Sequence, residues 1–148
     1  MAFYSSAPTQ WEGTAVEPQC DFLQPLVDPT VLRRLRAELD PDEDYCRIFV
    51  RNYMEQLPSR ISRLRWALRS GDLEAAMDAV LSLKTSSQMV GACCLGGIAD
   101  ELESALKKFP DSANPASTTL SRLGSTFLRR IDQCSGGTVT CLTAANAA

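Results

Sequence analysis

Apolar residues recur at steps of three and four along most of the chain, which is the period of an amphipathic helix. The longest such pattern lies between residues 42 and 71. Its apolar positions are Tyr45, Ile48, Phe49, Tyr53, Leu57, Ile61, Leu64 and Leu68. No window alternates apolar and polar residues convincingly enough to indicate a strand. The pattern therefore predicts an all-α protein.

Helix start signals precede the first two predicted helices. Asp28 followed by Pro29 is typical of an N-cap with proline at the first helical position, and it opens the segment VLRRLRAEL. Asp40-Pro41 repeats that signal before the long segment. We expect Pro58, inside the long segment, to kink the helix or to divide it in two.

Three further helices are predicted after the long segment. Ser70-Gly71-Asp72 ends it and caps a helix from about Leu73 to Val90. The next helix begins near Gly91 and is ended by Pro110, and Pro115 is well placed to start the last one. Helices joined by short polar links favour an antiparallel four-helix bundle, here with a short extra helix at the start.

The two ends of the chain lack this periodicity. Residues 1–24 mix Ser, Pro, Thr, Gln and Gly, so we expect an irregular N-terminal arm. From Ser135 the sequence SGGTVTCLTAANAA is small and polar, which predicts a flexible C-terminal tail over residues 135–148. The predicted helical bundle therefore covers residues 25–134.

Charge and hydropathy exclude several classes of partner. The net charge is −3, so the sequence lacks the excess of basic residues that is typical of a nucleic-acid-binding protein. Basic pairs such as Arg129-Arg130 are expected to lie on solvated helix faces. No apolar run approaches the ~20 residues needed to cross a bilayer, and the first residues lack the features of a signal peptide. We therefore expect a cytoplasmic protein with no nucleic-acid or membrane partner.

The chain contains six cysteines and no histidine. The cysteines show no CxxC spacing, so we expect no metal site and no cofactor, and we expect free thiols in a reducing compartment. The sequence has no glycine-rich phosphate loop. The carboxylates Asp100, Glu101 and Glu103 crowd one helix, where a solvated acidic face explains them better than catalysis. We therefore expect no enzymatic activity.

The helix from Leu73 to Val90 presents two different faces. On a helical wheel, one apolar stripe forms the expected core face: Leu73, Ala76, Met77, Val80, Leu83, Ser87 and Val90. Leu81 lies roughly 120° from the centre of that stripe, on the same flank as Lys84, Gln88 and Gly91. A glycine within a helix costs about 1 kcal/mol relative to alanine, so it commonly has a packing or access reason. Alternatively, the helix simply ends near Gly91 and Leu81 is an ordinary exposed leucine.

The residue types of this helix resemble the signature of histidine-containing phosphotransfer (HPt) domains. These domains carry a His-x-Leu-Lys-(Gly/Ser/Thr)-Ser-(Ser/Ala)-x-x-x-Gly-Ala helix, followed by a helix that ends in a Leu-Glu pair. The matching residues here are Leu83, Lys84, Thr85, Ser86, Ser87, Gly91, Ala92, Leu102 and Glu103. The resemblance extends over about residues 28–133, and it implies an antiparallel four-helix bundle.

The resemblance also implies a role in two-component phosphorelay signalling, with a response-regulator receiver domain or a hybrid histidine kinase as partner. In the family, the histidine accepts a phosphoryl group from a receiver aspartate, and the lysine three residues on helps to neutralise it. Counted back from Lys84, the histidine position is occupied by Leu81. Leucine offers no lone pair, and the serines of this helix have no adjacent base to activate them. The resemblance therefore implies a degenerate member, a pseudo-HPt protein that acts by recognition.

Two interpretations of the leucine remain open. The protein is either a pseudo-HPt adaptor or competitor, or a form of an active phosphocarrier in which leucine replaces the histidine. In both cases the expected partner-binding residues are Leu81, Lys84, Thr85, Gln88, Gly91 and Lys107. Lys107 is included because the family often has a basic residue near there on the neighbouring helix.

A function of a different class is a helical scaffold that forms homodimers or heterodimers through an apolar helix face, with no relation to phosphorelay. Trp66, Tyr53 and Phe49 are the residues that would supply such a surface. Burial in the core is the favoured expectation for each of the three.

Overall fold

The computed structural model describes residues 26–39, 44–109 and 117–147. Its helices are α1 (Pro29–Leu39), α2 (Tyr45–Ser70), α3 (Leu73–Met89), α4 (Cys93–Leu106) and α5 (Ser117–Ala147). No strand occurs in these residues, which confirms the all-α prediction. The predicted N-terminal arm and the Asp40-Pro41 cap lie outside the described residues.

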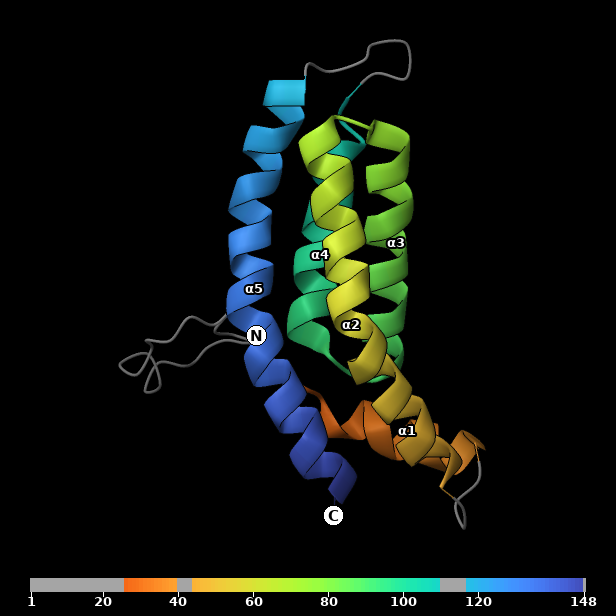
Figure 1. The fold of residues 1–148 in the computed structure, drawn as a ribbon. Coiled ribbons are helices and arrows are strands. Elements are labelled where there is room, and N and C mark those ends of the chain that lie inside the picture. The colour runs from red at the N-terminus through yellow and green to blue at the C-terminus, as the bar shows by residue number, and fades with distance from the viewer. Residues whose placement is uncertain (1–25, 40–43, 110–116, 148) are drawn as a thin grey trace, which may run out of the picture.

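Helices α2 to α5 form an antiparallel bundle, and α1 lies across one end of it (Figure 1). Both α2 and α4 pack against α3 and α5, so α3 lies diagonally across the bundle from α5. Helix α1 contacts α2. The predicted four-helix bundle with a short extra helix at the start is therefore confirmed. In the described part of the chain, no helix is long and apolar enough to cross a membrane.

Large aliphatic side chains from all four bundle helices form the core. The fully buried ones include Leu57, Leu64, Leu68, Leu83, Leu95, Ile98, Leu102, Leu106, Leu120, Ile131 and Leu142. Burying one such side chain is worth about 1.5–3 kcal/mol. These contacts, rather than surface ion pairs, hold the helices together.

The outer side of α2 departs from the predicted pattern. Tyr45, Ile48 and Trp66 are exposed, whereas Tyr53 is buried and Phe49 packs partly against the core. At about 100° per residue, Ile48 and Trp66 lie on the side of the helix opposite the core positions, so steps of three and four along the sequence overestimated the buried face. The expectation that Trp66 is buried is wrong.

Most helix ends follow the predicted signals. Asp28 caps α1, because its carboxylate accepts a hydrogen bond from the Thr30 amide at 2.9 Å. Gly71, with a φ of 76°, ends α2, and Asp72 accepts from the Ala75 amide at 3.0 Å to begin α3. Pro58 lies on the exposed side of α2 and does not divide it. Proline cannot donate the backbone hydrogen bond of a helix, but the buried residues on the opposite side of α2 keep the helix continuous at this position.

The C-terminal segment is helical, so the predicted flexible tail is wrong for residues 135–147. Cys134, Thr138 and Leu142 recur every four residues and are buried. Close packing explains one glycine in this segment, because a Cβ at Gly137 would lie 2.9 Å from Leu26 Cδ1. The small residues that suggested a tail therefore allow α5 to approach the chain before α1.

One cysteine also departs from expectation. Cys94 is disulfide-bonded, so the prediction of free thiols is wrong at this residue. Spacing along the sequence does not reveal pairing between distant cysteines. Cys46 is a buried free thiol in α2.

Candidate functional site

Leu81 lies on the outward side of α3, where 39% of its surface is exposed. Its neighbours Val80 and Leu83 are fully buried, because adjacent helical positions point in different directions. Most of the predicted core stripe is buried as expected: Ala76, Val80, Leu83, Ser87 and Val90. Leu73 and Met77 are partly buried against the same core. The predicted separation of Leu81 from the core face is confirmed.

Lys84 is held by two carboxylates of α4. Its Nζ lies 2.7 Å from Glu103 Oε1 and 3.0 Å from Asp100 Oδ1. Lys107 reaches the other oxygen of Glu103 at 2.9 Å. The hydrogen bond that Lys84 donates to Glu103 raises the pKa of Lys84, and the bonds that Glu103 accepts from Lys84 and Lys107 lower the pKa of Glu103. Both groups therefore stay ionised at neutral pH, and the charge of Lys84 is already compensated within the protein.

Glu103 is buried, which corrects the expectation of a solvated acidic face. Its position beneath Lys84 and Lys107 gives the carboxylate two cationic partners, which offsets the cost of removing it from water. Glu101, by contrast, is exposed and pairs with Arg130 of α5 at 2.9 Å. The Leu-Glu pair in the family signature was the one sequence signal that pointed to Glu103.

A hollow of about 470 Å³ lies beside Lys84, between α3, the start of α4 and the start of α1. It is lined by Asp28, Val31, Lys84, Gln88, Gly91, Cys93, Gly96, Gly97 and Asp100. Gly96 allows the close approach of α4, because a Cβ there would lie 3.3 Å from Gln88 Cγ. Lys84, Gln88 and Gly91 therefore share one hollow, which Leu81, Thr85 and Lys107 do not line.

Gly91 lies in the turn between α3 and α4 and not within a helix. Its φ is 80°, a left-handed conformation that favours glycine. Its carbonyl accepts a hydrogen bond from the Asp28 amide at 2.7 Å, and a Cβ would lie 2.8 Å from the Asp28 carbonyl oxygen. The helix thus ends near Gly91, as the alternative interpretation had it, and the glycine is required by the turn and by the contact with the start of α1.

The serine hydroxyls of α3 have structural partners. Ser82 Oγ accepts from Arg60 Nε of α2 at 3.2 Å, and Ser86 Oγ donates to the Ser82 carbonyl at 2.8 Å. Ser87 Oγ is buried at 2.8 Å from Tyr53 OH, and burial raises the pKa of Tyr53 to about 12. These hydroxyls connect α3 to α2 and to its own backbone, and each lies beside a group that is not a base at neutral pH.

The described residues hold no group of three or more His, Cys, Asp or Glu side chains placed to bind a metal ion. The α3 side of the bundle therefore offers an exposed apolar side chain, a compensated lysine, an exposed threonine and an exposed glutamine. Such groups recognise a surface, and they supply neither a nucleophile nor a base. The sequence alone did not assign Asp28, Gly96 or Asp100 to this side. Asp28 precedes α1, and the other two residues lie in α4, so only the packing of the helices brings them beside α3.

No protein-family model matches the sequence, and no curated protein matches it. Among solved structures, the fold is similar to the crystal structure of histidine-containing phosphotransfer protein B (HptB) from Pseudomonas aeruginosa PAO1. The two chains superpose with a TM-score of 0.67 over 83% of this chain and 96% of that chain, at 21% sequence identity. At this identity the likeness establishes the fold: the chain forms a helical bundle like that of an HPt protein.

Proposed function

We propose that the protein binds receiver domains of two-component signalling proteins and does not itself carry a phosphoryl group. The observation that carries the proposal is the exposure of Leu81 on α3 of an HPt-like bundle. The sequence resemblance assigns this position to the phosphoacceptor histidine. A leucine there cannot form a bond to phosphorus, but it can pack against a partner.

The proposed contact surface consists of Leu81, Lys84, Thr85 and Gln88, which we call the α3 docking surface. An apolar centre with polar side chains around it is the common composition of a protein interface. Because Lys84 is already paired with Asp100 and Glu103, it attracts an acidic pocket less than a free lysine would. Apolar contact at Leu81 should therefore dominate the affinity, and added salt should weaken binding only slightly.

The direct test is a titration of the purified protein with receiver domains encoded in the same genome. Leu81→Asp should weaken binding by about tenfold or more, since a charge would be buried at the centre of the interface. The matched control is Trp66→Asp, which places the same charge at an exposed apolar residue on the outer side of α2. The proposal fails if no receiver domain binds, or if the two variants bind alike.

The two interpretations of the leucine differ in what restoring the acceptor would do. Incubation of the Leu81→His variant with a phosphorylated receiver tests for an acid-labile phosphoryl group on the protein. Transfer to this variant would indicate a phosphocarrier site in which only the acceptor is missing. Binding without transfer would favour an adaptor or a competitor of true phosphotransfer proteins.

The scaffold alternative has less support. The dimerisation surface that it requires includes Tyr53, Phe49 and Trp66, but Tyr53 is buried with its hydroxyl against Ser87 and Phe49 packs partly on the core. Trp66 alone among the three is exposed, and a single exposed aromatic residue is ordinary for a soluble surface.

A further inference from the structure

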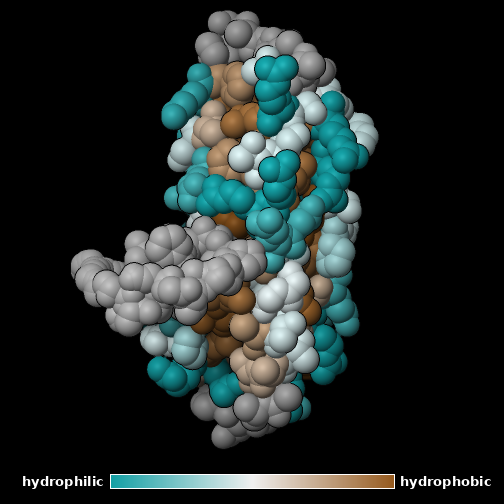
Figure 2. All heavy atoms as spheres, turned by 90° about the vertical axis from the view of Figure 1, so that its left-hand side faces the viewer, coloured by the Kyte–Doolittle hydropathy of each residue, from teal (hydrophilic) through white to brown (hydrophobic). Residues whose placement is uncertain are grey.

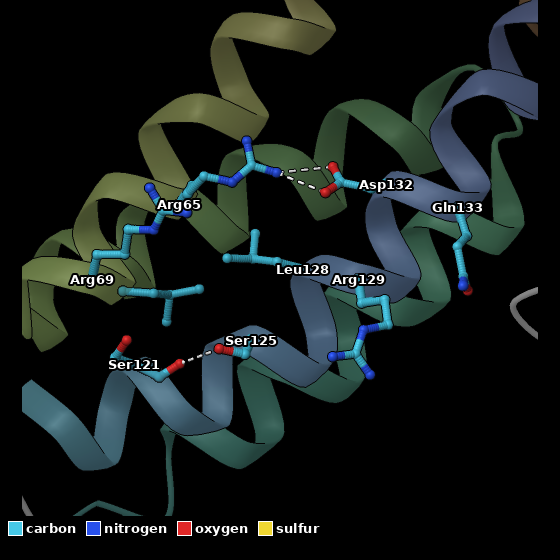
Figure 3. A pocket seen from close by; sticks show the side chains of 9 residues that line it. Arg65, Arg69, Ser121, Ser125, Leu128, Arg129, Asp132 and Gln133 are labelled. Carbon is cyan, nitrogen blue, oxygen red and sulfur yellow. Dashed lines mark hydrogen bonds and ion pairs between the residues drawn. The ribbon is translucent and has the colours of Figure 1, made fainter.

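A second hollow, of about 370 Å³, lies between α2 and α5 (Figure 3). None of the residues of the α3 docking surface lines it. We call it the α2/α5 groove. It is lined by Arg65, Leu68, Arg69, Ser121, Ser125, Leu128, Arg129, Asp132 and Gln133. Three arginines, two serines and a glutamine therefore line a hollow at the lower end of the size range of small-ligand sites, about 300–1,000 Å³.

The arginines of the groove differ in how they are paired. Arg65 Nη2 donates to both oxygens of Asp132, at 2.9 and 2.8 Å, and this pair bridges α2 and α5 (Figure 3). Asp132 is the one carboxylate among the described residues that line the groove. Arg69 on α2 and Arg129 on α5 have no hydrogen bond or ion pair within residues 26–39, 44–109 and 117–147. Their charges are therefore not compensated inside the groove.

The floor of the groove is formed by close packing. Leu68 and Leu128 are buried beneath the polar groups. Gly124 brings α5 against α2, because a Cβ there would lie 2.8 Å from Leu68 Cδ1 and 2.9 Å from Leu68 Cβ. The spacing of the two walls is thus fixed by the core, so the cationic groups are anchored on two rigid helices before any ligand arrives.

Charge is strongly segregated between the two pairs of helices. Helices α2 and α5 together carry nine arginines and two carboxylates. Helices α3 and α4 carry five carboxylates and one lysine. Hydrophilic side chains gather over the upper half of the α5 side of the molecule (Figure 2). An anion approaching this side therefore meets a positive local potential although the chain as a whole has a net charge of −3.

We propose that the α2/α5 groove binds the terminal phosphate of a small soluble diphosphate. The planar guanidinium group of Arg69 or of Arg129 matches two phosphate oxygens, and the Ser121 hydroxyl can donate a further hydrogen bond. Ser125 donates to the Ser121 carbonyl at 3.0 Å, so its hydroxyl oxygen remains an acceptor for a protonated phosphate oxygen. The groove binds the phosphate without making or breaking a covalent bond, and this binding does not depend on the receiver-binding function.

The test is a calorimetric titration of the full chain with ADP and with inorganic pyrophosphate, at about 0.15 M salt to screen general attraction. Arg69→Gln combined with Arg129→Gln should weaken binding about tenfold or more, because it removes the two cationic hydrogen-bond donors of the groove that are unpaired among the described residues. The matched control combines Arg63→Gln with Arg122→Gln, which removes two exposed arginines of the same helices outside the groove. The control should change the affinity by less than about twofold.

Three results would overturn the proposal. The first is the absence of binding by the unmodified protein, and the second is equal weakening in the groove variant and the control. The third is binding to vesicles containing phosphatidic acid with no binding of either soluble phosphate, which would assign the arginines to a lipid headgroup. Amide NMR shifts of Ser121 and Ser125 on addition of pyrophosphate provide a second readout in the unmodified protein, and unshifted resonances would also contradict the proposal.

Discussion

The two sides of the bundle hold their positive charges in different ways. On the α3/α4 side, Lys84 lies between Asp100 and Glu103, and Glu103 also binds Lys107. On the α2/α5 side, Arg65 has Asp132, but Arg69 and Arg129 have no partner in the described part of the chain. The α3/α4 side therefore presents an apolar side chain beside lysines whose charges are balanced by carboxylates. The α2/α5 side presents a hollow lined by two arginines without such a partner among the described residues.

This difference teaches that a cation near a candidate site is informative only once its partners are known. The lysine of the α3 motif suggested attraction to an acidic partner, yet its charge is already balanced across the α3–α4 contact. The basic pair Arg129-Arg130 suggested an ordinary solvated face, yet the packing of α2 against α5 places Arg129 in one groove with Arg65 and Arg69. The apolar centre at Leu81 and the cationic groove are thus expected to bind partners of opposite chemical character.

The largest predicted effect separates two leucines of the same helix. Leu83→Ala should lower the free energy of unfolding by about 2–5 kcal/mol, because Leu83 is fully buried and its removal leaves a cavity. Leu81→Ala should lower it by less than about 0.5 kcal/mol, as expected for an exposed position. Urea denaturation measures both. Similar losses for the two variants would mean that Leu81 is part of the core and not of a docking surface.

The next effect concerns two glycines of α5. Gly124→Ala should destabilise the protein, because the new methyl group would overlap Leu68, at a cost of about 1–3 kcal/mol that exceeds the gain in helix propensity. Gly136→Ala should stabilise the protein by up to about 1 kcal/mol, since nothing lies within 4 Å of the new methyl group. Thermal unfolding of both variants checks the signs. If Gly124→Ala is stabilising, the floor of the groove is not closely packed as described.

A pH series tests the compensated side. The folded-state pKa of Glu103 is lowered from its usual 4.5, so its contribution to stability is present above pH 4.5 and is lost as the pH falls through the folded-state value. Glu103→Gln should therefore lower the melting temperature at neutral pH, and the difference from the unmodified protein should narrow below pH 4.5. Glu101→Gln is the matched control, since its exposed pair should matter little at either pH. A difference in melting temperature between Glu103→Gln and the unmodified protein that stays constant with pH would argue against the Lys84–Glu103–Lys107 cluster.

The smallest effect concerns the exposed pair in the groove. Asp132→Asn should cost about 0.2–1 kcal/mol of stability, because exposed ion pairs contribute little. It should also tighten the binding of pyrophosphate, since it frees Arg65 and removes the carboxylate from the groove lining. Calorimetry with the variant checks this direction, and weaker binding would indicate that Asp132 positions Arg65 for the ligand.

Much of the fold was predictable because its signals are local. The caps at Asp28 and Asp72 and the turn at Gly71 depend on neighbouring residues alone. The core face of α3 follows from helical period, which also placed Leu81 outside it. The helical C-terminal segment was missed because its stability comes from the burial of Cys134, Thr138 and Leu142 against other helices.

The sites were less predictable because they join distant residues. The motif indicated that Lys84 lies near Leu81, but not that Asp100 and Glu103 hold it from α4. The sequence left open whether Gly91 lies within a helix or at its end, and only the structure shows that its left-handed conformation ends α3 and accommodates Asp28. The α2/α5 groove combines arginines that lie far apart in the sequence, Arg69 and Arg129, so no sequence window contains it.

The most direct test of the central claim is amide NMR mapping of the protein as a receiver domain is added. We predict that the largest shifts occur at Leu81, Thr85 and Gln88, and that they are retained when the receiver is not phosphorylated, because the contact at Leu81 is apolar. The resonances of Arg69 and Arg129 should remain in place. Shifts concentrated on α2 and α5, or no shifts with any receiver domain, would contradict the account.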